Sequence, residues 1–425
     1  MRVVIDARIR DGAYGGVQQW VIGLASGLSQ LPGDDEYLFL AIPGHHEWLE
    51  PYLGGGCRVL YPAPRRPPPR TKARRRLPPA LRHLWRLAAS SIPALGRIRP
   101  SVRVATPRDR SPIARSDGTV EQAGADVVHF SFQAAFLTTV PSIYQPWDLQ
   151  HLHLPDFFTP EQRAWREASY RAFCAQASLV VTASEWVRQD VIQQYGVEAE
   201  RIAVVNVPPV TTAYPELRAA DLEAIGDRLE LPDRFVFYPA QTWPHKNHVR
   251  LFEALRLLGD DGVTVPLVCT GLVNASGAGL QQLAVDLGID ANIRFLGYVA
   301  PVELKAVYQR ARALIFPSLY EGWGLPIVEA FSAGLPVACS NVTSLPKLVD
   351  GAALLFDPYD SMAIAAAIRR LWEDETLTED LARRGRAIAS RYDWRRTALI
   401  MRSHYRQVAG QALSDEDRAL LAGTA

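Results

Sequence analysis

Short apolar runs alternate with longer helical patterns along most of the chain, and this alternation limits the fold more than any other feature. Apolar runs of four to eight residues bounded by turn residues are typical of buried strands. The predicted strands of the first half are RVVIDA (2–7), YLFLAIP (37–43), DVVHFS (126–131) and SLVVTAS (178–184). Those of the second half are FVFYPA (235–240), VPLVCTG (265–271), NIRFLGYV (292–299), ALIFPS (313–318), LPVACS (335–340) and AALLFDP (352–358).

Helical patterns separate these strands, as in VQQWVIGLASGLSQL (17–31) and VRLFEALRLLG (249–259). Ser184 and Gly196 are placed to cap the two ends of a helix at 185–195. Such alternation of strand and helix predicts α/β domains in which helices cover both faces of a parallel sheet.

The 425 residues exceed one ordinary domain, so we predict two Rossmann-like domains. The predicted boundaries are an amino-terminal domain at 1–210, a polar linker at 211–232, a second domain at 233–395 and a closing helical segment at 396–425. Ligands of such sheets bind at the carboxyl ends of the strands, so the chemistry is expected in a cleft between the two domains.

Composition is that of a globular protein, with 48% apolar and 21% charged residues. No apolar run reaches 18 residues, and the amino terminus resembles a first strand more than a signal peptide, so a cytoplasmic location is expected. The four cysteines lie far apart and predict neither a zinc site nor a disulfide framework. They are Cys57, Cys174, Cys269 and Cys339.

Charge is concentrated in one segment. Residues 61–120 hold 15 Lys and Arg against 2 Asp, whereas the rest of the chain holds 31 basic and 43 acidic residues. The same segment contains 11 of the 31 prolines, which indicates an insertion that buries little apolar surface.

Three interpretations of this insertion remain open. It is a solvated excursion, or a contact with an anionic inner-membrane surface or lipid-linked acceptor through a basic amphipathic helix at 81–95, or a nucleic-acid site. The last ranks lowest, because Tyr61 and Trp85 are the only aromatic residues there. We therefore expect no nucleic-acid partner. A peripheral location on the cytoplasmic face of the membrane is one of the interpretations that stay open.

The stretch LYEGWGLPIVEA (319–330) follows a predicted strand and opens a helix. Glu321 is expected on the loop, and Glu329 in the first helical turn, with both carboxylates directed toward the cleft. Gly322 and Gly324 allow close approach of the backbone to a ligand, and a helix start favours a phosphate. Two carboxylates beside an anion-binding helix start suit a sugar joined to a diphosphate, because the carboxylates can accept hydrogen bonds from hydroxyl groups while the backbone binds the phosphate.

These residues resemble the E-x7-E motif of family-4 (group 1) retaining glycosyltransferases, which have the two-domain GT-B fold with a final helix returning to the amino-terminal domain. The resemblance implies that Glu321 lies beside the donor sugar and that Glu329 binds the nucleotide ribose. It also implies further donor contacts from Tyr298, Ser318, Gly322, Trp323, Gly324 and Leu325.

FYPAQTWPHKNHVRLFEAL (237–255) also resembles the family, and Lys246 matches the lysine that neutralises the departing diphosphate. Many members carry an arginine six residues earlier, where this chain has Ala240, so Lys246 is the single matching cation unless Arg250 or another residue compensates. The pair Gly15 and Gly16 matches glycines that approach the donor phosphate and the acceptor.

PSIYQPWDLQHLHLPDFFTPEQRAWRE (141–167) resembles a segment in which a histidine lines the acceptor and sugar pocket. Trp147 stands at that position here. The remaining polar candidates for the pocket are Asp148, His151 and His153.

The resemblance implies transfer of a hexosyl unit from GDP-mannose, a UDP-hexose or a dTDP-deoxyhexose to a glycan or lipid-linked acceptor, with retention, in surface polysaccharide synthesis such as that of lipopolysaccharide. The nucleotide sugar is a co-substrate, and no cofactor is expected. The only D-x-D lies at 415–417 in a polar tail, so no metal is expected either. The alternatives are a phosphorylase or nucleotide-sugar epimerase of the same fold, or a catalytically silent nucleotide-sugar binding protein.

Overall fold

A computed structural model describes residues 1–12, 15–62, 113–274 and 277–424. The helix predicted at 81–95 and most of the basic insertion lie outside these residues. The described chain contains two parallel sheets, and both belong to one compact unit made of residues 1–62 and 113–425.

The first sheet has seven described strands in the order β3-β2-β1-β4-β5-β6-β7, and every pair is parallel. The strands are β1 (Arg2–Asp6), β2 (Glu36–Leu40), β3 (Cys57–Leu60), β4 (Val127–Phe130), β5 (Ser142–Tyr144), β6 (Leu179–Thr182) and β7 (Ile202–Val204). Sequence patterns predict four of them and miss β3, β5 and β7.

The second sheet has six described strands in the order β10-β9-β8-β11-β12-β13, again all parallel. They are β8 (Val236–Pro239), β9 (Leu267–Thr270), β10 (Ile293–Phe295), β11 (Ala313–Phe316), β12 (Val337–Ser340) and β13 (Ala353–Phe356). All six agree with the sequence prediction.

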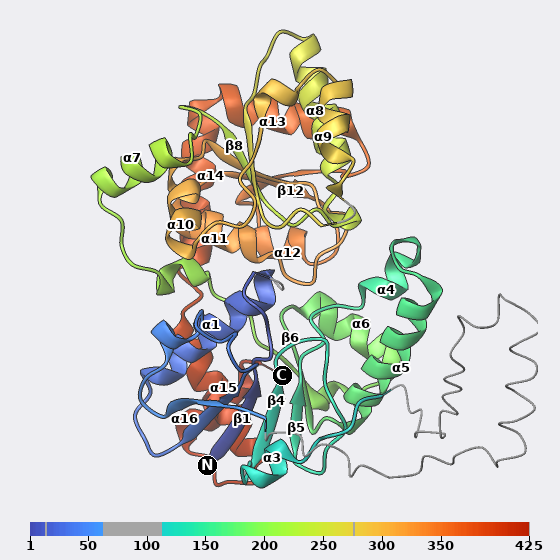
Figure 1. The fold of residues 1–425 in the computed structure, drawn as a ribbon, viewed down its shortest axis with the longest axis vertical. Helices are drawn as coiled ribbons and strands as arrows, with labels where there is room; N and C mark the ends of the chain where they lie inside the picture. Colours follow the sequence, from blue (N-terminus) through green and yellow to red (C-terminus); the bar gives the residue numbers. More distant parts are fainter. Residues whose placement is uncertain (13–14, 63–112, 275–276, 425) are drawn as a thin grey trace, which may run out of the picture. The chain divides into compact units, whose positions relative to one another are not determined.

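Helices cover both faces of each sheet (Figure 1). Those of the first domain are α1 (Gly15–Ser29), α3 (Thr119–Gln122), α4 (Gln150–His153), α5 (Pro160–Gln176) and α6 (Glu185–Tyr195). Those of the second are α8 (His248–Asp260), α9 (Leu280–Asp286), α10 (Pro301–Arg310), α11 (Leu325–Ala333), α12 (Leu345–Val349), α13 (Ser361–Glu373) and α14 (Glu375–Ala389). Short 3₁₀ turns are η1 (Glu50–Tyr52), η3 (Pro155–Phe157), η4 (Ala199–Arg201), η5 (Val210–Ala213), η6 (Pro244–Lys246) and η8 (Asp290–Asn292).

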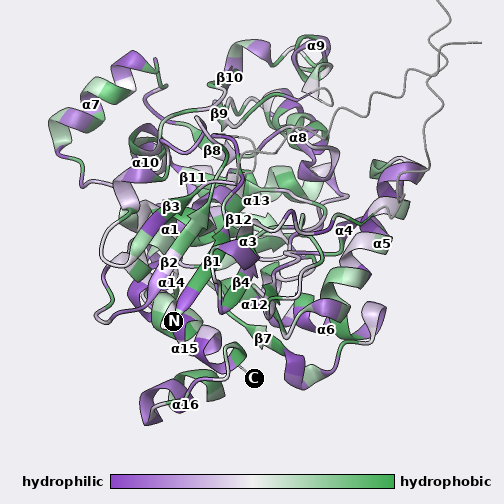
Figure 2. Cartoon of the chain, turned by 60° about the horizontal axis from the view of Figure 1, so that its bottom comes forward, coloured by the Kyte–Doolittle hydropathy of each residue, from purple (hydrophilic) through white to green (hydrophobic). Residues whose placement is uncertain are grey.

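Alternate residues of a strand face opposite sides of the sheet, so one strand contributes to two cores. Val3 and Ile5 of β1 pack in the core that contains Trp20 of α1, whereas Val4 packs in the core that contains Phe173 of α5. Figure 2 shows hydrophobic residues along the central strands and hydrophilic residues over the outer helices. Both faces of the first sheet are therefore buried.

Local end signals agree with the structure. The Ser184 hydroxyl accepts the Val187 amide hydrogen at the start of α6, and Gly196 ends that helix in the left-handed conformation. Gly334 ends α11 in the same way, with φ of 72°. The segment predicted as a linker at 211–232 carries the helix α7 (Ala219–Arg228).

The closing segment forms α15 (Trp394–Val408), which packs on α1 of the first domain as the GT-B resemblance implies, and α16 (Asp415–Ala422), which packs on α15. The Trp394 indole donates to the Pro209 carbonyl at 3.2 Å, and its ring lies 5.7 Å from that of Trp20. Tyr405 of α15 is 2.8 Å from His129 Nδ1 of β4. A buried hydrogen bond and aromatic packing therefore join the end of the chain to its first half.

The four cysteines are buried free thiols, in agreement with the sequence prediction. Among the helices of the described residues, none is long and apolar enough to cross a membrane.

Candidate active site

Lys246 and Glu321 meet at the carboxyl ends of two adjacent strands. Lys246 ends the turn η6 after β8, Glu321 lies on the loop after β11, and β8 pairs with β11 in the sheet. Their side chains form an ion pair with 2.5 Å between Lys246 Nζ and Glu321 Oε1. The ammonium group also lies 5.6 Å from the centre of the Phe316 ring. The two residues assigned to catalysis from sequence are thus in direct contact.

The backbone of the Glu321 loop is held by the loop that follows β12. The Thr343 hydroxyl accepts the Glu321 amide hydrogen at 3.1 Å, and the Ser344 hydroxyl donates to the carbonyls of Glu321 and Trp323. Gly324 precedes α11 with φ of 109°, a left-handed conformation that favours glycine. The loop can therefore turn sharply into a helix start.

Glu329 differs from the sequence prediction in position and environment. It lies in the second turn of α11, not the first, and its side chain is buried at 4% exposure instead of facing an open cleft. Tyr308 of α10 donates a hydrogen bond of 2.6 Å to Glu329 Oε2, while Oε1 has no partner in the described chain. Burial raises the pKa of Glu329 to about 7, and the Tyr308 hydrogen bond opposes that rise.

Of the two amino-terminal glycines, Gly16 lies near the second domain, whereas a side-chain carbon added at Gly15 would have no described atom within 4 Å. Gly15 begins α1 with φ of 33°, and a side-chain carbon added at Gly16 would lie 3.9 Å from Leu325 Cδ2 at the start of α11. Two helix starts therefore approach one another here. Tyr298, which is 46% exposed, donates from its hydroxyl to Asp11 Oδ1 at 2.9 Å and fastens this region.

Trp147 and Asp148 lie beside the Glu321 loop. The Trp147 indole donates to the Ser131 carbonyl at 2.8 Å, so its ring is directed into the first domain, and its φ of 68° is unusual for a residue with a side chain. A carbon added at Gly322 would overlap the Trp147 carbonyl and lie 3.3 Å from Asp148 Cβ. Burial raises the pKa of Asp148, and Arg166 opposes that rise.

The two candidate histidines have different surroundings. His151 is buried inside the first domain, where its ring lies edge-on to Tyr170 and its Nε2 is 3.3 Å from the Tyr195 hydroxyl. Burial lowers its pKa to about 4. His153 instead stacks on Tyr320 with 5.4 Å between ring centres, next to Glu321. The structure brings His153 to the Glu321 loop and leaves His151 in a core.

Other predicted donor contacts have mainly internal partners. The Ser318 hydroxyl is buried 3.4 Å from that of Tyr238, and the Trp323 indole donates to the Val207 carbonyl at 3.0 Å. Arg250, considered as a replacement for the arginine missing at Ala240, donates to the Tyr359 carbonyl and the Asn247 side chain, both at 3.3 Å.

Sequence reasoning missed Tyr308, the partner of Glu329, and two of the first-domain residues around Tyr320, namely Trp186 and Asp190. Tyr308 lies 21 residues before Glu329 on another helix, so no spacing rule links them. A contact between side chains on two different helices can be recognised only when the packing of those helices is known.

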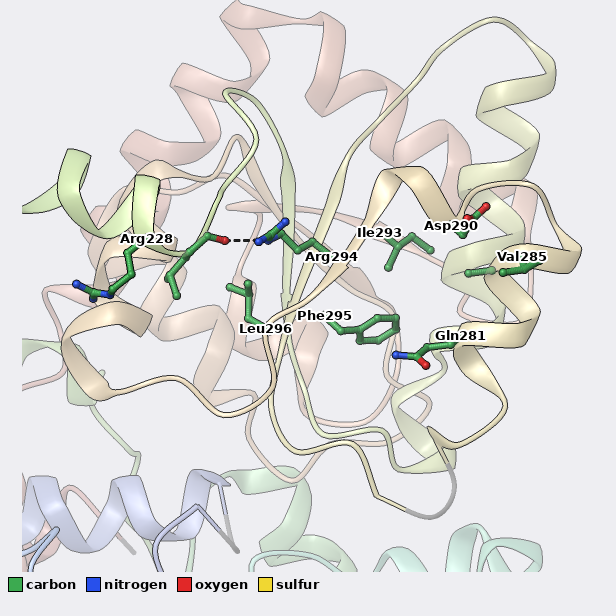
Figure 3. A pocket seen from close by; sticks show the side chains of 10 residues that line it. Arg228, Gln281, Val285, Asp290, Ile293, Arg294, Phe295 and Leu296 are labelled. Atoms are coloured by element: carbon green, nitrogen blue, oxygen red, sulfur yellow. Dashed lines mark hydrogen bonds between the residues drawn. The ribbon is translucent and has the colours of Figure 1, made fainter.

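A separate shallow pocket lies at the β10 edge of the second sheet, away from these residues (Figure 3). Arg294 crosses it and donates to the Leu229 carbonyl at 2.8 Å, so this cation is already engaged. In the described part of the chain, no three His, Cys, Asp or Glu side chains gather as metal ligands would.

Two family models match the chain. The model described as "Glycosyltransferase Family 4" matches residues 14–207, and the one described as "Glycosyl transferases group 1" matches residues 226–388. The chain belongs to the group 1 glycosyltransferases of family 4. The Lys246 and Glu321 segments lie inside the second match, and the Trp147 to His153 segment lies inside the first.

Similar group 1 glycosyltransferases include O-antigen chain mannosyltransferase B of Escherichia coli, 32% identical over 58% of this chain and 65% of that protein. Serotype-specific mannosyltransferase WbdA of Escherichia coli is 25% identical over 72% of this chain and 41% of that protein. Each match spans less than two thirds of the relative. Anabaena Alr3699/HepE in complex with UDP and glucose superposes with a TM-score of 0.68 at 19% identity, over 96% of this chain and 100% of that chain, which shows the GT-B fold.

Proposed function

We propose that this chain transfers a hexosyl unit from a nucleotide diphosphate sugar to a hydroxyl of a glycan or lipid-linked acceptor during surface polysaccharide synthesis. The carrying observation is the Lys246–Glu321 pair at the carboxyl ends of adjacent strands, with the unpartnered Glu329 oxygen on the helix that follows. The similar O-antigen mannosyltransferases make GDP-mannose the first donor to test, before UDP-hexoses and dTDP-deoxyhexoses.

In this proposal, Lys246 and the backbone N–H groups of Gly324 and Leu325 stabilise the departing diphosphate. Glu321 leaves its ion pair to hold the sugar, and Glu329 accepts from the ribose hydroxyls. The anomeric carbon loses its bond to the phosphate oxygen and gains one to the acceptor oxygen on the same face. The phosphate oxygen takes the acceptor proton, so the step retains configuration and needs no protein base or metal.

The domain roles belong to the same proposal. Residues 1–210 would present the acceptor through Asp148 and the neighbouring loop, and residues 233–395 would bind the donor. Closure of the two around the donor would exclude water, because hydrolysis competes with transfer to the acceptor.

The test is a panel of GDP-mannose, UDP-glucose and dTDP-rhamnose offered to the purified protein. We expect one of them to bind and to be hydrolysed slowly, with the first-formed sugar anomer, read by NMR, matching that of the donor. Inversion of the anomer would overturn retention. Binding of none would overturn the nucleotide-sugar assignment.

The same panel separates the alternatives. A phosphorylase would need inorganic phosphate and release a glycosyl phosphate, whereas an epimerase would return an isomerised nucleotide sugar. A silent binding protein would bind one donor and leave it intact. Each outcome replaces transfer by a different named activity.

The basic segment supports a second prediction about the acceptor. Its net charge of +13 would attract anionic lipid, so deletion of residues 64–115 should spare donor binding and weaken transfer to an acceptor in anionic vesicles. Transfer to a water-soluble acceptor, measured without detergent or vesicles, should not change and serves as the control. Equal vesicle activity with and without the segment would exclude a membrane role.

A further inference from the structure

Both chain neighbours of Glu321 contact the first domain, whereas the described hydrogen bonds of Glu321 itself are to Lys246, Thr343 and Ser344 of the second domain. Tyr320 precedes it and is 3% exposed despite lying in a loop. Gly322 follows it, and its carbonyl accepts a 2.7 Å hydrogen bond from the Ser184 hydroxyl at the start of α6. The position of this carboxylate therefore depends on contacts from the opposite domain.

Tyr320 fits among three side chains of the first domain. Its ring stacks on His153 with 5.4 Å between centres and 30° between planes, and meets the edge of Trp186 at 5.4 Å and 85°. Its hydroxyl lies 3.5 Å from Asp190 Oδ2. Stacked and edge-on contacts are both favourable geometries for aromatic rings, so together they fix the position of the Tyr320 ring.

The three side chains that surround Tyr320 also contact one another within the first domain. Nε2 of His153, on α4, lies 2.9 Å from both carboxylate oxygens of Asp190, on α6. Asp190 is 4% exposed, and the His153 ring is 5.5 Å from that of Trp186. Because these contacts join two helices of one domain, the arrangement of the three side chains does not depend on the presence of Tyr320.

We propose that His153, Asp190 and Trp186 form a socket that receives Tyr320 and thereby positions Glu321 toward the donor sugar. The three are positioning residues and do not contact the reacting atoms. The proposal rests on the transfer function proposed above and adds a coupling to it. Donor chemistry becomes efficient only when the first domain holds the Glu321 loop.

The variants His153→Leu and Tyr320→Leu remove the two sides of the stack. Each should lower kcat for GDP-mannose hydrolysis about tenfold to 100-fold, because misplacement of a positioning group costs rate more than affinity. The Kd for GDP-mannose should stay within about threefold, since the donor seat itself is intact. The double variant should be no slower than the worse single variant, because both break one contact.

Two further variants test the geometry. Tyr320→Phe keeps the ring and loses the hydroxyl contacts with Asp190 and the Leu149 backbone, so it should retain more activity than Tyr320→Leu. Gly322→Ala introduces a carbon that would overlap the Trp147 carbonyl, so it should block seating and lower kcat about 100-fold while GDP-mannose still binds. His45→Leu, an exposed residue of the first domain, is the control.

A readout without donor separates this proposal from the proposed function. Backbone amides of residues 319–325 should exchange hydrogen faster in His153→Leu than in the wild type, and not faster in His45→Leu. Unchanged exchange would overturn the socket whatever the activity, as would additive losses in the double variant. If exchange rises but the wild type neither binds nor hydrolyses GDP-mannose, the socket stands and the donor assignment fails.

Discussion

Replacing Lys246 by alanine is expected to lower turnover of the nucleotide-sugar donor by about 100-fold or more, because the leaving diphosphate loses its nearest cation. Among the residues that the structure describes, Lys246 is the basic side chain that pairs with Glu321, and Ala240 stands where many family members have an arginine. The loss should appear mainly in kcat, since charge on the leaving group grows in the transition state. Steady-state hydrolysis and calorimetric binding measure the two quantities.

Lys347→Ala is the matched control, because this lysine is exposed on α12 and forms no ion pair with any residue that the structure describes. Its kcat should equal that of the wild type. Arg250→Ala tests compensation, and a small effect is expected because Tyr359 and Asn247 already engage that guanidinium. A Lys246→Ala loss of less than about fivefold would contradict a role in leaving-group stabilisation.

Donor affinity is expected to rise with pH because of Glu329. Burial raises the pKa of this carboxyl to about 7, so it is mostly protonated at pH 6 and mostly ionised at pH 8. Ribose hydroxyls donate more strongly to the ionised form, so Kd should fall by up to about tenfold per pH unit between 6 and 7. Calorimetry in buffers of different ionisation enthalpy would also detect the proton released on binding.

Glu329→Gln should remove this pH dependence and weaken donor binding at pH 8 by about tenfold, the loss of a charge-assisted hydrogen bond. Glu303→Gln is a control, since that carboxylate lies at the start of α10 and pairs with Arg228. A wild-type Kd that does not change between pH 6 and 8 would contradict ribose binding by an ionised Glu329.

The same substitution should change stability in the opposite direction. The folded pKa of about 7 exceeds the ordinary value of 4.5, so the folded chain retains a proton that the unfolded chain loses between these pH values. This contribution is complete below pH 4.5 and is lost as pH rises through 7, by up to about 3 kcal/mol. Glu329→Gln should therefore melt above the wild type at pH 8 but close to it at pH 5. A difference in melting temperature between the variant and the wild type that stays constant from pH 5 to pH 8 would contradict a raised pKa of the buried Glu329 carboxyl.

Strand prediction succeeded where a run was long and bounded by turn residues. All six strands of the second sheet have such runs, and ALIFPS leads directly to the site. β5 and β7 contain only three residues each, and their pairing with β4 and β6 makes them strands. β10 is equally short but lies within the longer predicted run NIRFLGYV, so a strand of three residues needs either such a run or its paired neighbours to be recognised.

The candidate site divides in the same way. Lys246 and Glu321 follow strands whose carboxyl ends meet at one sheet edge, so their approach could be predicted from the chain. His151 and His153 could not be told apart, because two residues in a short helix face different sides, one toward Tyr195 and one toward Tyr320. The direction of each side chain depends on helices that come from distant parts of the sequence.

Local order along the chain was thus sufficient for the α/β class, the two sheets and the loops that carry the motif residues, because hydrophobic periodicity and capping act over a few neighbouring positions. Tertiary packing alone decided that Glu329 is buried against Tyr308 and that Tyr320 sits among His153, Trp186 and Asp190. These contacts join elements separated by 21 to 167 positions. Burial and charge at such contacts arise only when the separate elements exclude water together.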